Sequence, residues 1–239
     1  MLQAVSAHLQ PFVNRLRSRS PLTETERLAI LELPGQMVHA PPNVDVVKAS
    51  EEADHVCYVV DGLVARLDDS ASGQRSITGL HIPGEVPDLH AIVLPGRTVA
   101  LHALSPATIL QIPQSAVRAV AAAHPAIAKA FWQSCMVDAM ILAQWIVNVG
   151  HRNAKCRIAH LICEMALRYR GGQLSGKVVY SLPMSQAHLA AATGLTSIHV
   201  NRTLKALKSE GVEFRRGTVY IADWSRLVQV GKFDLNYLQ

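Results

Sequence analysis

The chain has 239 residues, of which 49% are apolar and 17% charged, and its formal net charge is +5. This length exceeds that of a typical single domain, and the apolar content is enough for two buried cores. The longest apolar run, residues 136–147, is interrupted by Asp138 and Gln144 and is shorter than the ~18 to 20 residues that span a bilayer. Residues 1–20 contain no continuous apolar core before a small-residue cleavage site. We therefore expect a two-domain cytoplasmic protein with no membrane segment.

The positive charge is concentrated in one part of the chain. Residues 151–217 contain eleven Lys and Arg against three Glu, a balance of +8, which leaves −3 for the other residues. This distribution is typical of a nucleic-acid-binding module joined to a neutral or acidic domain. The four cysteines (Cys57, Cys135, Cys156 and Cys163) lack the close pairing of zinc or iron–sulfur sites. We expect them to be buried, reduced thiols, with no bound metal.

The first part of the chain, to about residue 113, predicts many short antiparallel strands. A short helix precedes them at residues 21–33, where Thr23 and Glu26 have the spacing of a capping box. Asp61-Gly62 predicts a two-residue hairpin between "CYVV" and "LVARL", and Ser72-Gly73 predicts a second one. Together these signals predict a β-sandwich or β-roll.

Residues 124–150 predict one long helix, because they contain neither Gly nor Pro between Pro125 and Gly150. At 1.5 Å per residue such a helix reaches ~40 Å, which is too long for a simple connector. Its apolar residues cover more than one stripe, so we expect it to pack on its own domain and on a second copy of the chain. A core helix of a single chain is the alternative. The residues predicted for the dimer interface are Phe131, Cys135, Asp138, Ile141, Leu142 and Trp145.

The last part of the chain predicts a helix-turn-helix. After a helix at 154–170 and a strand-like stretch at 177–184, Ser185 can cap one short helix and Thr196 the next, with Gly194 in a left-handed turn between them. Ala190 is small where the two helices must cross, and Val200 packs into the same junction. Alternating residues around Arg216-Gly217 predict a hairpin in the position of a wing.

The helix within "GLTSIHVNRTLKALKSEG", residues 194–211, has one apolar and one polar face. Val200, Leu204 and Leu207 form the apolar stripe. The second helix of a helix-turn-helix lies in the major groove, where an arginine such as Arg202 can donate two hydrogen bonds to guanine. The predicted base-reading residues are Ser197, Ile198, His199, Asn201 and Arg202. The predicted contacts to the phosphates of double-stranded DNA are Ser185, Gln186, Thr196, Lys205, Lys208, Arg215 and Arg216.

With these motifs the chain resembles the cyclic-AMP receptor/FNR (CRP/FNR) family of bacterial transcription regulators. The resemblance covers almost the whole chain, through the "IPGE" turn at 82–85, the long helix, "HRNAKCRIAHLICEMALR" and "LPMSQAHLAAATGLTSIHVNRTLKALKSEGV". It implies an α+β fold with a cyclic-nucleotide-binding-like β-roll that senses an effector (1–123), a dimerisation helix (124–150) and a winged helix-turn-helix (151–239).

The resemblance also implies a function. It implies a regulator rather than an enzyme, which binds a two-fold-symmetric site as a homodimer and contacts RNA polymerase. Arg202 stands at the position of the family's base-reading arginine. The family's neighbouring glutamate is absent, and Ile198 and His199 occupy its neighbourhood, so the family's operator sequence does not carry over.

The sequence leaves the identity of the effector open. Members that bind cyclic nucleotides hold the ribose and phosphate with a Gly-Glu-Leu segment and, some ten residues later, an Arg-Ser or Arg-Thr pair. Here the resemblance assigns these roles to Gly84, Glu85, Asp88, Leu89, Arg97 and Thr98. Asp88-Leu89 stands in place of Glu-Leu, and Pro87 removes one amide donor from the anion site. A cyclic nucleotide is therefore a possible effector with a degenerate motif, and the absence of an FNR-type N-terminal cysteine cluster argues against an iron–sulfur sensor.

A metal enzyme or a metal- or haem-binding sensor with an accessory DNA-binding domain is the alternative. Five histidines fall in the β-region, and histidine is a common ligand of transition metals. They are His39, His55, His81, His90 and His102. No pair has a tight ligand spacing and no catalytic partner is evident, so this reading is the weaker one.

Overall fold

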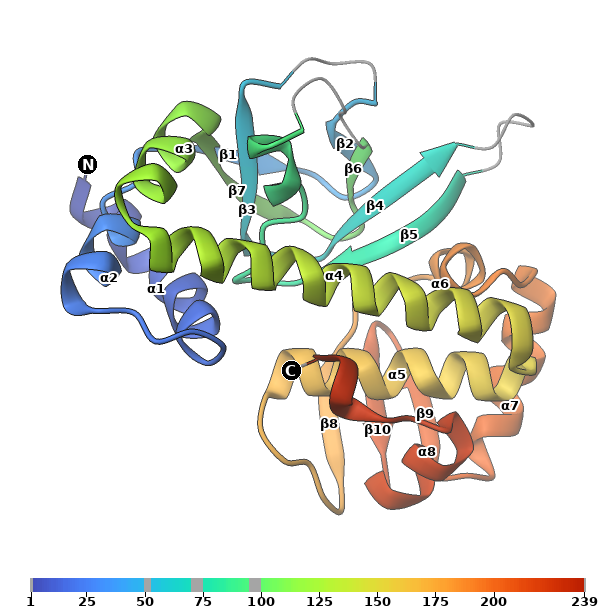
Figure 1. The fold of residues 1–239 in the computed structure, drawn as a ribbon. Coiled ribbons are helices and arrows are strands. Elements are labelled where there is room, and N and C mark those ends of the chain that lie inside the picture. The colour runs from blue at the N-terminus through green and yellow to red at the C-terminus, as the bar shows by residue number, and fades with distance from the viewer. Residues whose placement is uncertain (1, 50–52, 70–74, 95–99, 239) are drawn as a thin grey trace. The chain divides into compact units, whose positions relative to one another are not determined.

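The computed structural model describes residues 2–49, 53–69, 75–94 and 100–238, without the side chains of residues 2–5 and 69 (Figure 1). Its chain forms two compact units. Unit 1 contains residues 1–68 and 79–139, and unit 2 contains residues 69–78 and 140–239. The division falls inside the long helix, α4 (Pro125–His151), so this helix contributes to both units.

Unit 1 is built around antiparallel strands. One sheet has the order β1–β7–β3, with β1 (Gln36–Ala40), β7 (Ala107–Pro113) and β3 (His55–Asp61). The other has the order β2–β6–β4–β5, with β2 (Val44–Val47), β6 (Ala100–Ala103), β4 (Val64–Asp69) and β5 (Arg75–His81). The last residue of β4 and residues 75–78 of β5 are counted with unit 2. Unit 1 also contains four helical segments, α1 (Leu2–Arg17), α2 (Glu24–Leu31), the 3-10 turn η1 (Leu89–Ile92) and α3 (Gln114–Ala123), and the start of α4. This mixed α+β architecture confirms the predicted fold class.

The turn at Asp61-Gly62 is not a hairpin, which corrects the sequence prediction. β3 and β4 belong to different sheets, so this turn carries the chain from one sheet to the other. Gly62 has a φ of 91°, and a Cβ atom there would lie 2.5 Å from the carbonyl oxygen of Pro106. Glycine is therefore required by both backbone conformation and close packing. Ser72-Gly73 lies outside the described residues, although β4 and β5 on either side of it are neighbours in the sheet.

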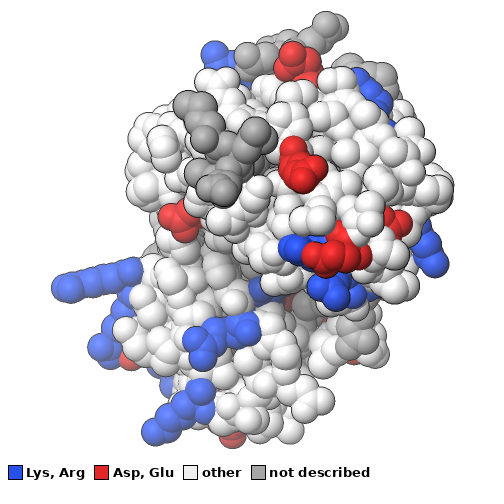
Figure 2. All heavy atoms as spheres, turned by 90° about the vertical axis from the view of Figure 1, so that its left-hand side faces the viewer, with Lys and Arg blue, Asp and Glu red and all other residues white. Residues whose placement is uncertain are grey.

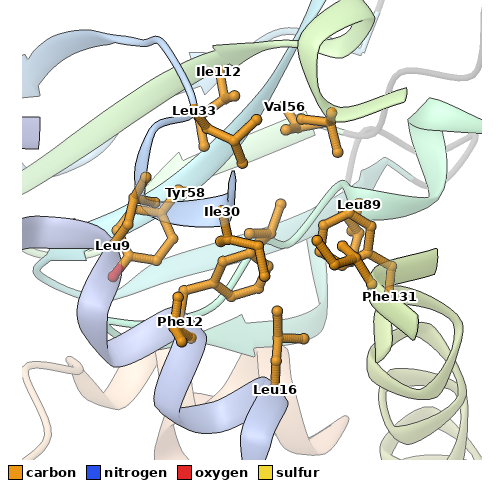
Figure 3. Close-up of a cluster of buried hydrophobic side chains, with 14 of the residues drawn as sticks. Leu9, Phe12, Leu16, Ile30, Leu33, Val56, Tyr58, Leu89, Ile112 and Phe131 are labelled. Atoms are coloured by element: carbon orange, nitrogen blue, oxygen red, sulfur yellow. The ribbon is translucent and has the colours of Figure 1, made fainter. Parts of the chain in front are cut away.

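Helix α1 completes the core of unit 1. Leu9, Phe12 and Leu16, spaced three and four apart, are buried and point toward the sheet residue Tyr58 and toward Phe131 of α4 (Figure 3). The ring of Phe12 lies 5.9 Å from each of those two rings, centroid to centroid. Sequence analysis missed this helix, because Pro11 lies inside it and weakens the helical signal.

Unit 2 contains the predicted winged helix-turn-helix. Its helices are α5 (Ala154–Arg170), α6 (Gln186–Thr193), α7 (Ser197–Lys208) and α8 (Trp224–Gly231), followed by the 3-10 turn η2 (Leu235–Leu238). Its three-stranded sheet has the order β8–β10–β9, with β8 (Val178–Ser181), β10 (Thr218–Ile221) and β9 (Val212–Arg215). The bounds of α5 are those predicted from the sequence.

A buried polar network ties three elements of unit 2 together. Glu164 of α5 is completely buried, and its Oε2 accepts hydrogen bonds from Trp145 Nε1 of α4 (2.9 Å) and from the Tyr237 hydroxyl of η2 (3.0 Å). Its Oε1 accepts a hydrogen bond from Arg168 Nη1 (3.0 Å). The end of α4 and the C-terminal turn are thus fastened to α5 through one carboxylate.

Candidate nucleic-acid interface

The turn between α6 and α7 has the predicted caps. The Ser185 hydroxyl accepts a hydrogen bond from His188 N (3.1 Å), and the Thr196 hydroxyl accepts one from His199 N (3.2 Å). Gly194 has a left-handed backbone, with φ of 63° and ψ of 36°. A Cβ atom at this glycine would lie 3.1 Å from Cγ1 of Val149, so close packing also favours glycine here. These features fix the angle at which α7 leaves α6.

The exposed face of α7 carries the predicted base-reading side chains. Ser197, His199 and Arg202 are exposed, and Ile198 has 69% of its surface accessible. Asn201 is half-buried, and its Nδ2 donates a hydrogen bond to Oε1 of Gln186 (3.3 Å). Arginine, histidine and an aliphatic side chain therefore share one surface that can meet base edges.

The buried face of α7 differs in one position from the prediction. Val200 and Leu207 are fully buried as expected, whereas Thr203 is buried and Leu204 only partly so. Thr203 lies three residues after Val200 and four before Leu207, so it belongs to the same stripe. Leu204 was assigned to this buried stripe in the sequence analysis because leucine is more apolar than threonine.

Cations continue from α7 onto the wing. Lys205 and Lys208 are exposed on α7, and Arg215 and Arg216 are exposed at the turn between β9 and β10. Arg216 and Gly217 both have positive φ, 47° and 73°, which is the backbone of a tight hairpin turn and confirms the predicted wing.

The surface charge agrees with the charge count along the sequence. On the face shown in Figure 2, the surface of unit 2 carries mainly Lys and Arg side chains, whereas that of unit 1 carries acidic side chains as well. A concentration of positive charge in the unit with the helix-turn-helix favours an anionic partner for that unit.

Comparison with known proteins finds matches for two separate parts of the chain. Residues 37–124 match the model of the cyclic nucleotide-binding domain, and residues 156–230 match that of the Crp-like helix-turn-helix domain. The chain belongs to the CRP/FNR family of DNA-binding transcription regulators.

Several relatives extend over most of this regulator. The transcriptional activator protein FnrL of Cereibacter sphaeroides is 23% identical over 214 residues, which cover 86% of this chain and 84% of FnrL. The transcriptional regulatory protein btr of Bordetella pertussis is 27% identical over 194 residues, which cover 80% of this chain and 78% of btr. The structure of FixK2 from Bradyrhizobium japonicum shares the fold, with a TM-score of 0.73 and 23% identity over 83% of this chain and 98% of that one.

Two residues of the predicted effector segment of this CRP/FNR regulator make contacts within unit 1. Asp88 is buried, and its Oδ1 accepts a hydrogen bond from the backbone N–H of Cys57 (2.8 Å). Leu89 is buried in the core of unit 1. Both residues were predicted to hold an effector, and in this structure both side chains are buried within the chain. Local sequence could not show this, because the partner Cys57 lies 31 residues away.

Gly84 and Glu85 also have hydrogen-bond and ion-pair partners within the chain. The Gly84 N–H donates to the carbonyl oxygen of Val59 (2.9 Å), and the Glu85 N–H to that of Ile82 (3.2 Å). The Glu85 carboxylate lies 3.0 Å from Nη1 of Arg15 in α1. An anion at this turn would therefore meet a carboxylate and two amides that already have acceptors. Arg97 and Thr98 lie outside the described residues.

The histidines of the β-region were the candidate ligands of a metal ion. Within the described ranges, no three His, Cys, Asp or Glu side chains lie close enough together to hold a metal ion. His39 Nδ1 lies 3.1 Å from the Thr108 hydroxyl, and His102 Nδ1 lies 2.6 Å from Oδ1 of Asp45.

All four cysteines are free, as expected, and Cys57, Cys156 and Cys163 are buried.

Asp88 makes the stability of this regulator depend on pH. Burial raises its pKa from 3.8 to about 6, so the folded chain binds a proton that the unfolded chain releases at lower pH. The contribution of Asp88 to the free energy of unfolding is therefore favourable near pH 4 and is lost as the pH rises through 6. We expect Asp88→Asn to be about 1 to 3 kcal/mol more stable than the wild type at pH 7, with the difference shrinking toward pH 4. Urea unfolding of both proteins at pH 7 and pH 4.5 measures this, and an equal difference at the two pH values would contradict it.

Helix α4 has two apolar stripes on opposite sides. Phe131, Ile141 and Trp145 are buried in their own chain, which corrects their assignment to the dimer interface, and Cys135, Asp138 and Leu142 on the same side are partly buried. The opposite side, which we call the outer stripe, is apolar and exposed. It consists of Trp132, Met136, Ala139, Met140, Ala143, Ile146 and Val147. Sequence periodicity revealed two stripes but could not show which one faces the chain's own core.

Proposed function

We propose that this regulator reads a specific, two-fold-symmetric DNA site as a homodimer, with α7 of each copy in the major groove. The observation that carries this proposal is the exposed face of α7, where Arg202 lies beside Ile198 and His199 behind a capped turn. Arg202 donates to guanine O6 and N7, and Ile198 contacts a thymine methyl group. Asn201, once released from Gln186, bonds adenine or a phosphate.

The surrounding polar groups position the protein on the DNA backbone. Lys205, Lys208, Arg215 and Arg216 are cations on the same side of the helix-turn-helix and its wing, and they neutralise phosphates. The hydroxyls of Ser185 and Thr196 accept from backbone amides as caps, and their hydrogens stay available to donate to phosphate oxygens. These contacts give affinity without sequence preference and make binding salt-dependent.

The outer stripe of α4 supports the homodimer. Trp132 and Ile146 are 63% and 74% exposed, and an exposed apolar stripe along a long helix is the surface that a second copy would bury. The two copies of α7 would then lie one DNA turn apart, ~34 Å, which matches adjacent half-sites. By length and composition α4 is also apolar enough to cross a membrane. One of its sides, with Phe131, Ile141 and Trp145, is buried within its own chain, so we assign the outer stripe to protein contacts as well.

Location and partners follow from this role. A regulator that reads DNA works in the bacterial cytoplasm, and we place the protein there. FnrL is named as a transcriptional activator, which supports contact with RNA polymerase by this chain as well. For the effector, the engaged groups at 84–89 favour a signal other than a cyclic nucleotide.

Selection from a randomised duplex library, with sequencing of the bound fraction, tests the function directly. The full-length protein is used at fixed salt with and without cyclic AMP. We expect the same two-fold-symmetric site in both conditions. Recovery of the site only with cyclic AMP would overturn the proposal on the effector, and no enriched site in either condition would overturn the assignment of α7 to base reading.

Replacing Arg202 by alanine separates base reading from phosphate contact. We expect Arg202→Ala to lose ~1 to 3 kcal/mol of binding free energy on the selected site and little on random DNA. Lys205→Ala is the matched control on the same face, and it should weaken both complexes by a similar factor. Fluorescence anisotropy with the two duplexes at one salt concentration measures both variants. Equal losses for Arg202→Ala on the two duplexes would reassign Arg202 to phosphate.

A further inference from the structure

An acidic side chain lies among the cations of the proposed DNA-binding face. Glu213 is on β9, and its Oε2 lies 2.6 Å from Nη2 of Arg215 on the same strand. Its Oε1 lies 3.2 Å from Nζ of Lys208 at the end of α7. One carboxylate therefore binds two of the four cations proposed to meet phosphates, with one oxygen for each.

The carboxylate is ionised while it makes these contacts. The hydrogen bond from the Arg215 guanidinium lowers the pKa of Glu213 below its ordinary value, and the Lys208 ammonium adds to the effect. Arg215 and Lys208 have 66% and 60% of their side chains exposed, and Glu213 has 29%. Ion pairs with this exposure are weak and exchange readily, so a phosphate can replace the carboxylate.

The other acidic residue of this region has a different environment. From residue 195 to residue 221 the sequence contains only Glu210 and Glu213 as acidic residues. Glu210 is nearly buried, with 11% of its side chain exposed, and it pairs with Lys155 and Arg226, which are not among the residues proposed to bind DNA. Glu210 thus joins parts of the unit to one another, whereas Glu213 engages the proposed phosphate-binding cations themselves.

We infer that Glu213 is an intramolecular competitor of DNA phosphates, which holds Lys208 and Arg215 in the free protein and lowers sequence-independent affinity. This inference rests on the proposed function of the α7 face. Binding to DNA must first break the two ion pairs, and the carboxylate then stays near the phosphates and repels them. Both effects are the same for every DNA sequence, so Glu213 weakens specific and random binding by a similar factor. Weaker non-specific binding leaves the protein free to dissociate from the many wrong sites of a genome.

The test is the salt dependence of binding by Glu213→Gln. Anisotropy titrations with a random-sequence duplex at 50 to 200 mM salt give the affinity and its logarithmic slope. Loss of one acidic charge at the interface is equivalent to about one more neutralised phosphate, which steepens the slope by about 0.9. The variant should therefore bind more tightly than the wild type, and its advantage should be about threefold larger at 50 mM than at 200 mM salt.

Asp234→Asn is the matched control. It changes the net charge equally at an exposed residue near η2, where the Asp234 carboxylate accepts hydrogen bonds from Asn236. We expect it to change the slope much less than Glu213→Gln. In a Lys208→Gln/Arg215→Gln background, the effect of Glu213→Gln on affinity should be smaller, because only the repulsion between the Glu213 carboxylate and the phosphates is left to remove.

The outcomes separate this inference from the function on which it rests. If the wild type binds duplex DNA but Glu213→Gln binds equally or more weakly, Glu213 orients the cations instead and the inference is overturned alone. Equal tightening by Asp234→Asn would attribute the effect to net charge and would also overturn it. A wild type that binds no duplex even at 50 mM salt would overturn both the inference and the proposed function.

Discussion

Glu164→Ala is expected to lower the free energy of unfolding by about 3 to 5 kcal/mol. Glu164 is completely buried and accepts hydrogen bonds from Trp145, Arg168 and Tyr237. Alanine would remove the carboxylate beside the Arg168 guanidinium, whose side chain is only 5% exposed, and would leave two further buried donors without this acceptor. Urea unfolding followed by circular dichroism measures the loss.

Glu164→Gln is the control for this prediction. Glutamine keeps the volume and one acceptor oxygen, so it should lose clearly less stability than alanine while still removing the charge beside Arg168. Trp145 provides a local readout, because its indole N–H donates to Glu164 and its fluorescence should change in both variants. A loss below about 1 kcal/mol for alanine would show that the network adds little to the fold.

Trp132→Glu combined with Ile146→Glu is expected to make the protein monomeric. Both side chains lie on the outer stripe of α4, and two carboxylates facing a second copy would have to be buried without partners. A monomer contacts one half-site at a time, so its affinity for the two-fold-symmetric site should fall roughly 100-fold or more. Light scattering measures the molar mass of the protein in solution, and fluorescence anisotropy measures its affinity for the two-fold-symmetric DNA site.

The control places a charge on an apolar residue elsewhere. Leu28 of α2 is also exposed, at 42%, and Leu28→Glu should leave the mass and the DNA affinity unchanged. The residues first predicted for the interface behave differently. Phe131→Ala, for example, should destabilise the chain, because Phe131 is buried in unit 1. A double variant that stays dimeric would exclude the outer stripe as the interface.

Local signals predicted several of the helices and turns. Helix α5, the capping box at Thr23 and Glu26, and the left-handed turn at Gly194 each depend on residues close together in sequence. The same holds for the exposed face of α7, which the helical repeat defines without knowledge of the rest of the fold. The residues that form the exposed face of α7 could therefore be predicted from the sequence.

Features set by distant residues were not predicted. The sequence predicts a hairpin at Gly62, and the close approach of the Pro106 carbonyl oxygen is visible only in the structure. Likewise, Asp88 was predicted as an effector ligand, and its hydrogen bond from Cys57 N–H is visible only in the structure. The ion pair between Glu213 and Lys208 likewise depends on how β9 lies beside the end of α7. In these cases the residue types were visible in the sequence, but their partners were set only by the tertiary fold.

The two apolar sides of α4 also have a consequence during synthesis. A newly made chain can bury one side by folding alone, whereas in the proposed homodimer the outer stripe stays in contact with water until a second chain binds to it. For the proposed homodimer, stability should therefore rise with protein concentration, as it does for obligate dimers. At low expression the same surface becomes a site for aggregation or for recognition by chaperones and proteases. The cell would then hold little of the unpaired regulator, and its supply of active protein would rise more steeply than its rate of synthesis.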